Sequence, residues 1–317
     1  MMHLLFSSDN NYAIQLCVVI TSILNNKNKD DRLFFHIIDG GISKKNKDII
    51  SNYCKKYDAD MEFLNIDSSI FEQYSVYGGL SLATYYRLIA SSLFPKLDKI
   101  LYLDSDIIVR GSLKEFYDLN IDNYYFVGVE DVLREKNIKR IEIISKYCNA
   151  GVLLLNLKLW RKEKIESKFF EYADKYKYNE KMMRYNDQDI LNVVCQNAIS
   201  YINPKFNLQV SELSMSKRMN NIALNESDGI LHFFSPKKPW KNWTNHPFEK
   251  EYYKYLKMSP YSRLYYQRIL HIIERIVYPQ KILESIFAVK KINGIKTLII
   301  FGIKIKLKKN KTLKGAK

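Results

Sequence analysis

Short apolar segments rich in β-branched and aromatic residues alternate with segments of helical periodicity, and this alternation restricts the fold more than any other feature. The strand-like segments are 3–8, 33–39, 61–67, 99–109, 124–130, 150–157 and 229–234. The helix-like segments are 12–26, 43–57 and 81–94, the last of which stops at Pro95. Alternating strands and helices are typical of an α/β fold. We therefore predict a mainly parallel central sheet flanked by helices.

This fold class selects candidate site residues, because ligands of open α/β sheets bind outside the carboxyl ends of the strands. Asp9 and Asn11 follow the first strand-like segment, and Asp104 and Asp106 close the fourth. His232 ends a late one. Residues far apart in the sequence are thus expected to meet at one rim. Because neither G-x-G-x-x-G after the first strand nor G-x-x-x-x-G-K-[ST] occurs, any nucleotide has to be held by another device.

The sequence LYLDSDIIV places two carboxylates, Asp104 and Asp106, within an apolar run. In an extended segment the two side chains would point to the same side, with Ser105 facing away. Two carboxylates that close repel each other unless a cation lies between them, so we predict a divalent metal ion. The alternative is a solvated turn, which is the usual meaning of Asp-x-Asp in charged loops.

His232, in GILHFFSPKKPW, is the candidate third ligand. Two carboxylates and one imidazole suit Mn²⁺ better than Mg²⁺. The lysines that follow, Lys238 among them, offer a point charge for a diphosphate. The alternative for His232 is a buried core histidine with no ligand.

Two further segments carry polar side chains next to apolar runs. In YNDQDIL, Asp187, Gln188 and Asp189 precede a predicted helix, where one of the acids is expected to cap the amino end. Asn149 precedes a predicted buried strand and is either a turn residue or a ligand for a hydroxyl group.

Charge is concentrated at the carboxyl end. Residues 261–317 hold 14 Lys or Arg and 2 Glu, which accounts for +12 of the formal net charge of +16 and leaves +4 on residues 1–260. In TLIIFGIKIKLKKNK, apolar residues alternate with lysine. We predict a catalytic domain over 1–260 and a basic amphipathic region over 261–317 that docks on an anionic membrane surface. The alternative is a solvated basic tail, and nucleic acid is not an expected partner.

Neither the amino terminus nor the cysteines indicate export. MMHLLFSSDNNY has no basic leader and too short an apolar run for a signal peptide, so the catalytic part is expected in the cytoplasm. The four cysteines have no metal-ligand spacing and are expected to be reduced and buried.

Five segments, taken together and in order, resemble glycosyltransferase family 8, which contains bacterial lipopolysaccharide galactosyltransferases and glucosyltransferases. They are SSDNNYAIQLCVVITSILNN, LATYYRLIASSLFPKLDKILYLDSDIIVRGSL, NAGVLLLNLKLWRK, YNDQDILN and HFFSPKKPW. The resemblance covers residues 3 to about 245. It implies the GT-A nucleotide-sugar-binding fold and a retaining hexosyltransferase that uses a UDP-sugar and Mn²⁺, with Mg²⁺ as the alternative ion.

The resemblance also implies roles for individual residues. The metal ligands would be Asp104, Asp106 and His232. UDP would be held by Ser7, Asp9, Asn11, Tyr12, Asp104, Ser105 and Lys238. The donor sugar would be bound by Arg87, Asn149, Asp187 and Gln188, of which Arg87, Asp187 and Gln188 are the candidate catalytic residues.

Gln188 matches the position near the reacting anomeric carbon, and an amide is a poor nucleophile. This favours front-face attack over double displacement. One departure from the family pattern is Ser235, which stands where a glycine is usual. A serine there adds a side chain where the backbone approaches the diphosphate.

Composition does not distinguish UDP-glucose from UDP-galactose and names no acceptor. A lipopolysaccharide or lipooligosaccharide core, or another cell-surface glycan, is the expected acceptor because the basic region would hold the enzyme at the inner face of the cell membrane. Segments 129–147 and 211–229 are candidate acceptor-side loops. Two other functions fit the Asp-x-Asp sequence: a Mg²⁺-dependent phosphohydrolase and a non-catalytic protein that binds nucleotide sugars.

Overall fold

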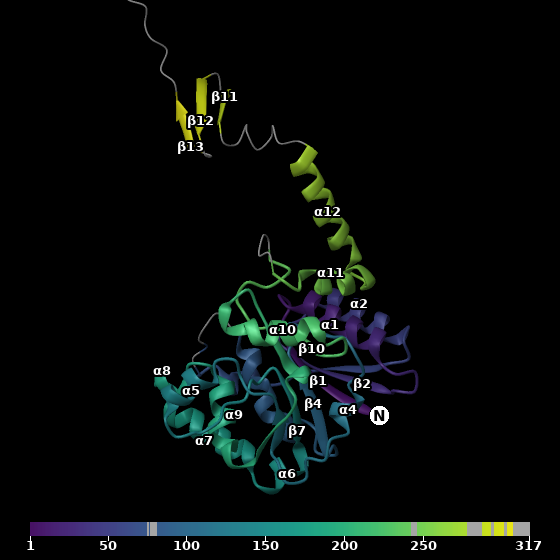
Figure 1. Cartoon of the computed structure of the whole chain (residues 1–317), viewed down its shortest axis with the longest axis vertical. Helices are drawn as coiled ribbons and strands as arrows, with labels where there is room; N and C mark the ends of the chain where they lie inside the picture. The colour runs from purple at the N-terminus through teal and green to yellow at the C-terminus, as the bar shows by residue number, and fades with distance from the viewer. Residues whose placement is uncertain are drawn as a thin grey trace, which may run out of the picture. The chain divides into compact units, whose positions relative to one another are not determined.

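The computed structural model describes residues 1–74, 76, 81–241, 246–277, 287–292, 295–300 and 303–306. The chain forms two compact units, Met1–Tyr261 and Ser262–Lys317 (Figure 1).

A seven-stranded sheet runs through the first unit. Its order is β3 (Asp60–Leu64), β2 (Leu33–Asp39), β1 (Met2–Ser8), β4 (Lys99–Leu103), β7 (Val152–Asn156), β6 (Phe126–Gly128) and β8 (Ile199–Tyr201). Strands β3, β2, β1 and β4 are parallel, and β6 is parallel to β8. Strand β7 runs antiparallel to both of its neighbours. The prediction of a mainly parallel central sheet is therefore confirmed.

Helices cover both faces of this sheet, because successive strand residues point to opposite sides. Leu4 and Phe6 pack in one core cluster with α1 (Ala13–Asn26) and α2 (Lys44–Lys55). Leu5 packs in a second cluster with α6 (Leu157–Lys162), α7 (Ile165–Tyr176) and α9 (Asp187–Cys195). Figure 1 shows α1 and α2 close to α11 (Glu249–Met258), away from α7 and α9.

The remaining helices of this unit are short connections. The α-helices are α3 (Ala90–Leu93), α4 (Lys114–Tyr117), α5 (Arg134–Ile141), α8 (Glu180–Met183) and α10 (Lys217–Asn225). The 3₁₀-helices are η1 (Ser68–Phe71), η2 (Leu82–Ile89), η3 (Gln196–Ala198), η4 (Pro204–Asn207) and η5 (Ser214–Ser216). The helix predicted over 81–94 is thus mostly 3₁₀. It lies against the sheet and α7 and is buried on most sides, so tertiary contacts override its helical periodicity.

The prediction of one strand over 99–109 is wrong. Strand β4 ends at Leu103, the chain turns over 104–106, and β5 (Ile107–Val109) joins a different sheet. That three-stranded sheet has the order β5, β10 (Ile230–Phe233) and β9 (Leu208–Val210). Asp104 and Asp106 therefore lie in a turn and not on an extended strand. Pairing of Ile107 with His232 is what brings the histidine to this turn.

The second unit contains α12 (Ser262–Val277) and an antiparallel meander of β11 (Phe287–Ile292), β12 (Ile295–Ile300) and β13 (Ile303–Lys306). Residues 278–286 and 307–317 of the predicted basic region lie outside the described residues. Within the described part of the chain, no helix is both long and apolar enough to cross a membrane.

Candidate functional site

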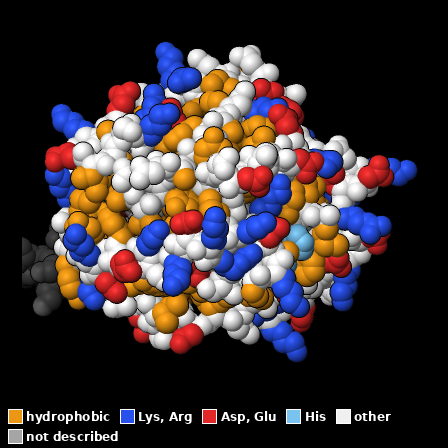
Figure 2. All heavy atoms as spheres, turned by 90° about the horizontal axis from the view of Figure 1, so that it is seen from below, with side chains coloured by type: hydrophobic (Ala, Val, Ile, Leu, Met, Phe, Trp, Pro, Cys, Tyr) orange, Lys and Arg blue, Asp and Glu red, His pale blue; other side chains and the backbone are white. Residues whose placement is uncertain are grey.

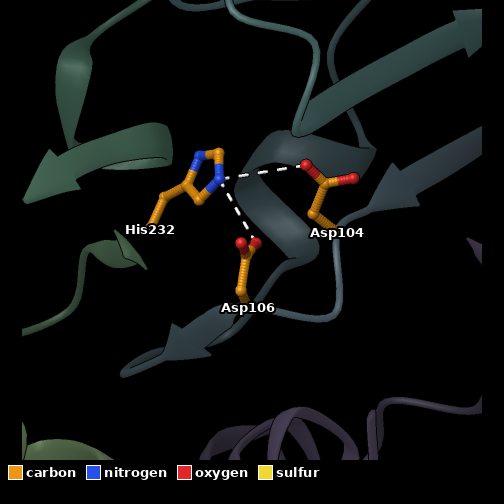
Figure 3. A group of neighbouring side chains, drawn as sticks. All are labelled: Asp104, Asp106 and His232. Atoms are coloured by element: carbon orange, nitrogen blue, oxygen red, sulfur yellow. Dashed lines mark ion pairs between the residues drawn. The ribbon is translucent and has the colours of Figure 1, made fainter. Parts of the chain in front are cut away.

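Three side chains converge at the turn between β4 and β5. Figure 3 shows Asp104 and Asp106 on the turn and His232 pointing at both from β10. His232 Nε2 lies 3.8 Å from Asp104 Oδ2 and 3.3 Å from Asp106 Oδ1. One ligand atom from each residue falls within 4.8 Å of the others, an arrangement that could hold a metal ion. The predicted metal ligands are thus brought together.

Gly151, directly before β7, makes this approach sterically feasible. Its carbonyl accepts a hydrogen bond from the Asp104 N–H at 2.8 Å. A Cβ at this position would lie 2.4 Å from His232 Cε1 and 2.7 Å from Asp104 Oδ2. A glycine is therefore required for the backbone to pass between the two ligands.

The tautomer of His232 follows from its hydrogen bond to Asn207. His232 Nδ1 lies 2.9 Å from Asn207 Oδ1, and the amide of Asn207 is oriented by a 2.8 Å bond from its Nδ2 to Asn149 Oδ1. Since Asn207 Oδ1 can only accept, Nδ1 carries the proton. Nε2 is then left with a lone pair directed toward the carboxylates, as a metal ligand requires.

Cations surround both carboxylates. Asp104 Oδ1 accepts from Arg87 Nη2 at 3.0 Å and from the Tyr102 hydroxyl at 2.8 Å. Asp106 Oδ2 accepts from Lys238 Nζ at 2.8 Å. Although burial opposes it, the charge of the Lys238 ammonium lowers the pKa of the Asp106 carboxyl below its usual range. Asp106 is therefore a carboxylate at neutral pH, ready to bind a cation.

Unsatisfied polar atoms at the same rim fit a missing ligand. Among the described residues, Asp106 Oδ1 and the hydroxyls of Ser7 and Ser105 are buried without a hydrogen-bond partner. Buried polar groups are normally paired, so such atoms indicate a ligand or an ion. Carboxylate oxygens with one imidazole suit Mn²⁺ and, less well, Mg²⁺. The residues present therefore fit a divalent cation.

Gln188 is fixed in a buried network beside the metal site. Its Oε1 accepts from the Ala150 N–H at 2.9 Å, and its Nε2 lies 3.3 Å from Asp131 Oδ2. The same carboxylate oxygen accepts from Asn149 Nδ2 at 2.9 Å. Burial raises the pKa of the Asp131 carboxyl, which its hydrogen bonds from Asn149, the Leu133 N–H and Gln188 oppose. Asn149 thus orients the network and, through Asn207, the metal ligand as well.

Arg87 bridges two acids from a buried position. Its Nε lies 3.0 Å from Asp187 Oδ2 and its Nη2 contacts Asp104, while its guanidinium stacks 3.9 Å from the centre of the Tyr102 ring. Burial raises the pKa of the Asp187 carboxyl to about 7, against the opposing charge of Arg87. Arg87 therefore links the metal-site turn to the start of α9.

Asp189, in contrast, serves the fold. Its Oδ2 accepts from the Tyr185 N–H at 2.9 Å, and its Oδ1 lies 2.6 Å from Arg140 Nη2. The cap position of α9 is Asn186, whose side chain makes no capping hydrogen bond, so the expected acidic cap in YNDQDIL is not found and Asp189 lies in the first turn of the helix.

The segment after β1 reaches the same rim. Asp9 Oδ1 accepts from the N–H groups of Asn11 and Tyr12 at 2.9 and 3.1 Å, which fixes the loop and leaves its second oxygen outside these two bonds. The Tyr12 ring meets Trp240 edge-on at 6.1 Å. Burial raises the pKa of Tyr12, and the charge of Asp106 adds to the rise. Tyr12 therefore connects the segment after β1 with Trp240.

Ser235, which stands where a glycine is usual, makes hydrogen bonds that a glycine could not make. Its buried hydroxyl donates to Glu212 Oε2 at 2.8 Å and accepts from the Lys237 N–H at 3.2 Å. The serine thus ties the Lys238 loop to the segment before α10, and its side chain does not obstruct the site.

Three positioning residues were not predicted from the sequence: Tyr102, Asp131 and Asn207. Asp131 has a usable signal, because it comes directly after a predicted strand, at the edge where ligands bind. Asn207 and Tyr102 have none, since their roles depend on contacts across the fold.

Comparison with known proteins identifies relatives over most of the chain. The sequence model described as glycosyl transferase family 8 matches residues 3–244. A lipopolysaccharide 1,2-glucosyltransferase of Escherichia coli is 28% identical over 304 residues, covering 91% of this chain and 89% of that protein. A lipopolysaccharide 1,3-galactosyltransferase of Salmonella typhimurium is 28% identical over 268 residues, covering 81% and 78%.

Among solved structures, galactosyltransferase LgtC in complex with donor and acceptor sugar analogs superposes with a TM-score of 0.71. It is 27% identical, and the match covers 82% of this chain and 96% of that one. The fold is therefore the GT-A fold, and the phosphohydrolase interpretation of Asp104 and Asp106 is disfavoured.

The contacts of Gly151 generate a prediction. In Gly151→Ala the new Cβ displaces His232 or Asp104, so Mn²⁺ binding in the presence of UDP should weaken at least about tenfold, as measured by electron paramagnetic resonance of free Mn²⁺. Gly128→Ala is the matched control, since its Cβ would crowd Cys148 Sγ at 2.6 Å, a residue outside the predicted ligand set. Urea denaturation should show similar destabilisation of both, about 1–3 kcal/mol. Wild-type Mn²⁺ affinity in Gly151→Ala would contradict the assignment.

Proposed function

Because the chain belongs to glycosyltransferase family 8, we propose that it transfers galactose or glucose from a UDP-sugar to a hydroxyl of a cell-surface glycan, with retention of configuration. The convergence of Asp104, Asp106 and His232 carries this proposal. The names of the relatives support a lipopolysaccharide or lipooligosaccharide core as the acceptor. The catalytic unit itself is a GT-A glycosyltransferase.

Asp104, Asp106 and His232 would hold a divalent cation, with Mn²⁺ preferred because one ligand is an imidazole. Such an ion, when bound, stabilises the negative charge that develops on the UDP leaving group. Lys238 lies at the same carboxylate and would turn to the diphosphate as a second cation. Its ion pair with Asp106 at 2.8 Å keeps the ammonium beside the proposed metal ligands.

The uridine and phosphates would lie along the rim from β1 to the metal site. Ser7 and Ser105 offer buried hydroxyls without partners in the described part of the chain, and these could bond to UDP oxygens. Asp9 would accept from the uracil N–H, and Asn11 and Tyr12 would complete this part of the site. These assignments rest on the family resemblance together with the common location of the residues.

Front-face attack is the mechanism that the donor-side residues favour. The bond between the anomeric carbon and the UDP oxygen breaks with its electron pair going to UDP, and the acceptor oxygen bonds to that carbon from the same face. The leaving phosphate oxygen takes the acceptor's proton. Gln188 is held by the Ala150 N–H beside Asp131 and would orient the sugar, since an amide is a poor nucleophile.

The proposal predicts slow release of UDP from a UDP-hexose without any acceptor. Mn²⁺ should support this release best, Mg²⁺ less, and EDTA should abolish it. Asp106→Asn should lower the rate at least about 100-fold. Asp118→Asn is the control, because Asp118 is an exposed acid that directly follows α4, and it should leave the rate unchanged. Comparison of UDP-galactose with UDP-glucose identifies the donor. Metal-independent release, or none from any UDP-sugar, would contradict the proposal.

The second unit supports attachment to a membrane surface. Cross-strand pairing places Val289, Leu298 and Ile305 in one row, with Val289 and Ile305 exposed. The next row on the same face pairs Ile300 with Ile303, which is also exposed. Lys291 and Lys296 pair on this same face, Lys290 and Lys304 lie on the opposite face, and all four are exposed. Exposed apolar and basic groups together fit an anionic lipid surface.

The first unit lacks such a concentration of charge on the face shown in Figure 2. There, Lys and Arg side chains are interspersed with Asp and Glu. The C-terminal region would therefore direct the enzyme to the inner face of the cell membrane, where a lipid-linked acceptor lies.

Removal of the second unit tests this role. Tyr261 belongs to the first unit and donates from its hydroxyl to Asn46 Oδ1 at 2.8 Å, so a chain ending at Tyr261 keeps this contact. It should retain UDP release but pellet at least about tenfold less with phosphatidylglycerol vesicles, given about 1 kcal/mol for each lost charge at the surface. Full-length protein and neutral phosphatidylcholine vesicles are the controls. Unchanged pelleting of the shortened chain would contradict membrane docking by this unit.

A further inference from the structure

A cavity of about 210 Å³ lies beside the site described above and uses none of its residues. Three separate segments line it, and they contribute Val129, Glu130 and Arg134 after β6, Tyr201 at the end of β8 with Ile202 and Pro204 after it, and Arg218 and Met219 on α10. The first and last belong to the two loops that the sequence predicts on the acceptor side. At liquid density this volume holds about seven waters, which is the size of one small ring with a charged substituent.

The lining combines an apolar wall with two guanidinium groups. Val129 and Met219 are buried, and the Tyr201 ring carries Lys146 Nζ at 5.1 Å from its centre. Arg134 pairs with Glu130 at 3.3 Å. Within the described part of the chain no ion pair uses Arg218, which is exposed on α10. The cavity therefore offers an aromatic face and an excess of positive charge.

One backbone segment separates this cavity from the donor-side network. Glu130 lines the cavity, while the next residue, Asp131, contacts Gln188 and Asn149. Gln209 fixes this segment from both sides, since its Nε2 donates to the Glu130 carbonyl at 2.8 Å and its Oε1 accepts from the Val132 N–H at 2.9 Å. A glycan of more than one unit could thus occupy the cavity with one unit while another lies near Gln188.

We infer that this cavity is an acceptor subsite for a sugar ring that carries a carboxylate or a phosphate. The fork of Arg218, aided by Arg134, matches the two oxygens of either group, and the Tyr201 ring matches the apolar face of a pyranose. The inference rests on the proposed function only where it identifies the bound sugar as part of the acceptor. Recognition of an acidic sugar by these residues requires no turnover.

Binding of small probes to the full-length chain, followed by nuclear magnetic resonance titration, tests the inference. Glucuronic acid and glucose 6-phosphate represent the two anionic groups, with glucose and inorganic phosphate as reference probes. At least one acidic sugar should bind about tenfold more tightly than glucose and than inorganic phosphate. The better of the two identifies the anionic group.

Arg218→Ala should weaken binding of that acidic sugar about tenfold, and Tyr201→Leu should weaken it severalfold. Lys217→Ala is the matched control, because it removes the same charge from the neighbouring exposed position on α10 and does not line the cavity. It should change binding less than twofold. Equal losses in Lys217→Ala and Arg218→Ala would show non-specific attraction and overturn the inference, as would equal binding of glucose.

Release of UDP without acceptor separates this inference from the proposed function. Arg218→Ala should leave that release unchanged, since Arg218 lies outside the metal and donor-side residues. Normal UDP release with no binding of either acidic sugar would overturn the subsite alone. Binding of an acidic sugar in a protein that releases no UDP would overturn the transferase proposal and leave the sugar site in place.

Discussion

The pairing of β5 with β10 is the interaction on which the site depends. Three register pairs, from Ile107 with His232 to Val109 with Ile230, hold a strand from the carboxyl-terminal half against the turn that follows β4. Without this small sheet His232 would be distant from Asp104 and Asp106. Because Gly151 has no side chain, the backbone directly before β7 lies close to both residues, and the Gly151 carbonyl accepts a hydrogen bond from the Asp104 N–H. The cluster that could hold a metal ion is thus a consequence of backbone pairing as much as of the side chains.

Hydrogen bonds extend this arrangement to the donor side. Asn207 sets the tautomer of His232 and bonds to Asn149, which in turn bonds to Asp131 beside Gln188. On the other side, Arg87 connects Asp104 with Asp187. Such shared partners couple the orientation of the proposed metal ligands to that of the proposed sugar-binding residues, because a shift of one amide moves the next.

Much of this was predictable because the chain obeys simple periodicity. The alternation of strands and helices predicts the sheet. The rule that ligands bind at the carboxyl ends of strands then predicts Asp9, Asp104 and Asp106 as site residues. The break after Leu103 was not predictable, since Ile107–Val109 has the same apolar character as β4 and differs only in its pairing partner. The burial of Arg87 is equally invisible to local patterns, as it depends on two acids from distant segments. The cavity near Arg218 combines three segments that no local signal connects.

The most direct test of the account is a crystal structure with UDP and Mn²⁺, with data collected at the manganese absorption edge. The account predicts an anomalous peak bonded to Asp104, Asp106 and His232 Nε2 and to the diphosphate, at about 2.0–2.2 Å from the nitrogen and oxygen ligands by analogy with other divalent ions. Lys238 should leave Asp106 for a phosphate oxygen. A peak elsewhere, or UDP bound at the rim with no metal at these three residues, would contradict the central claim.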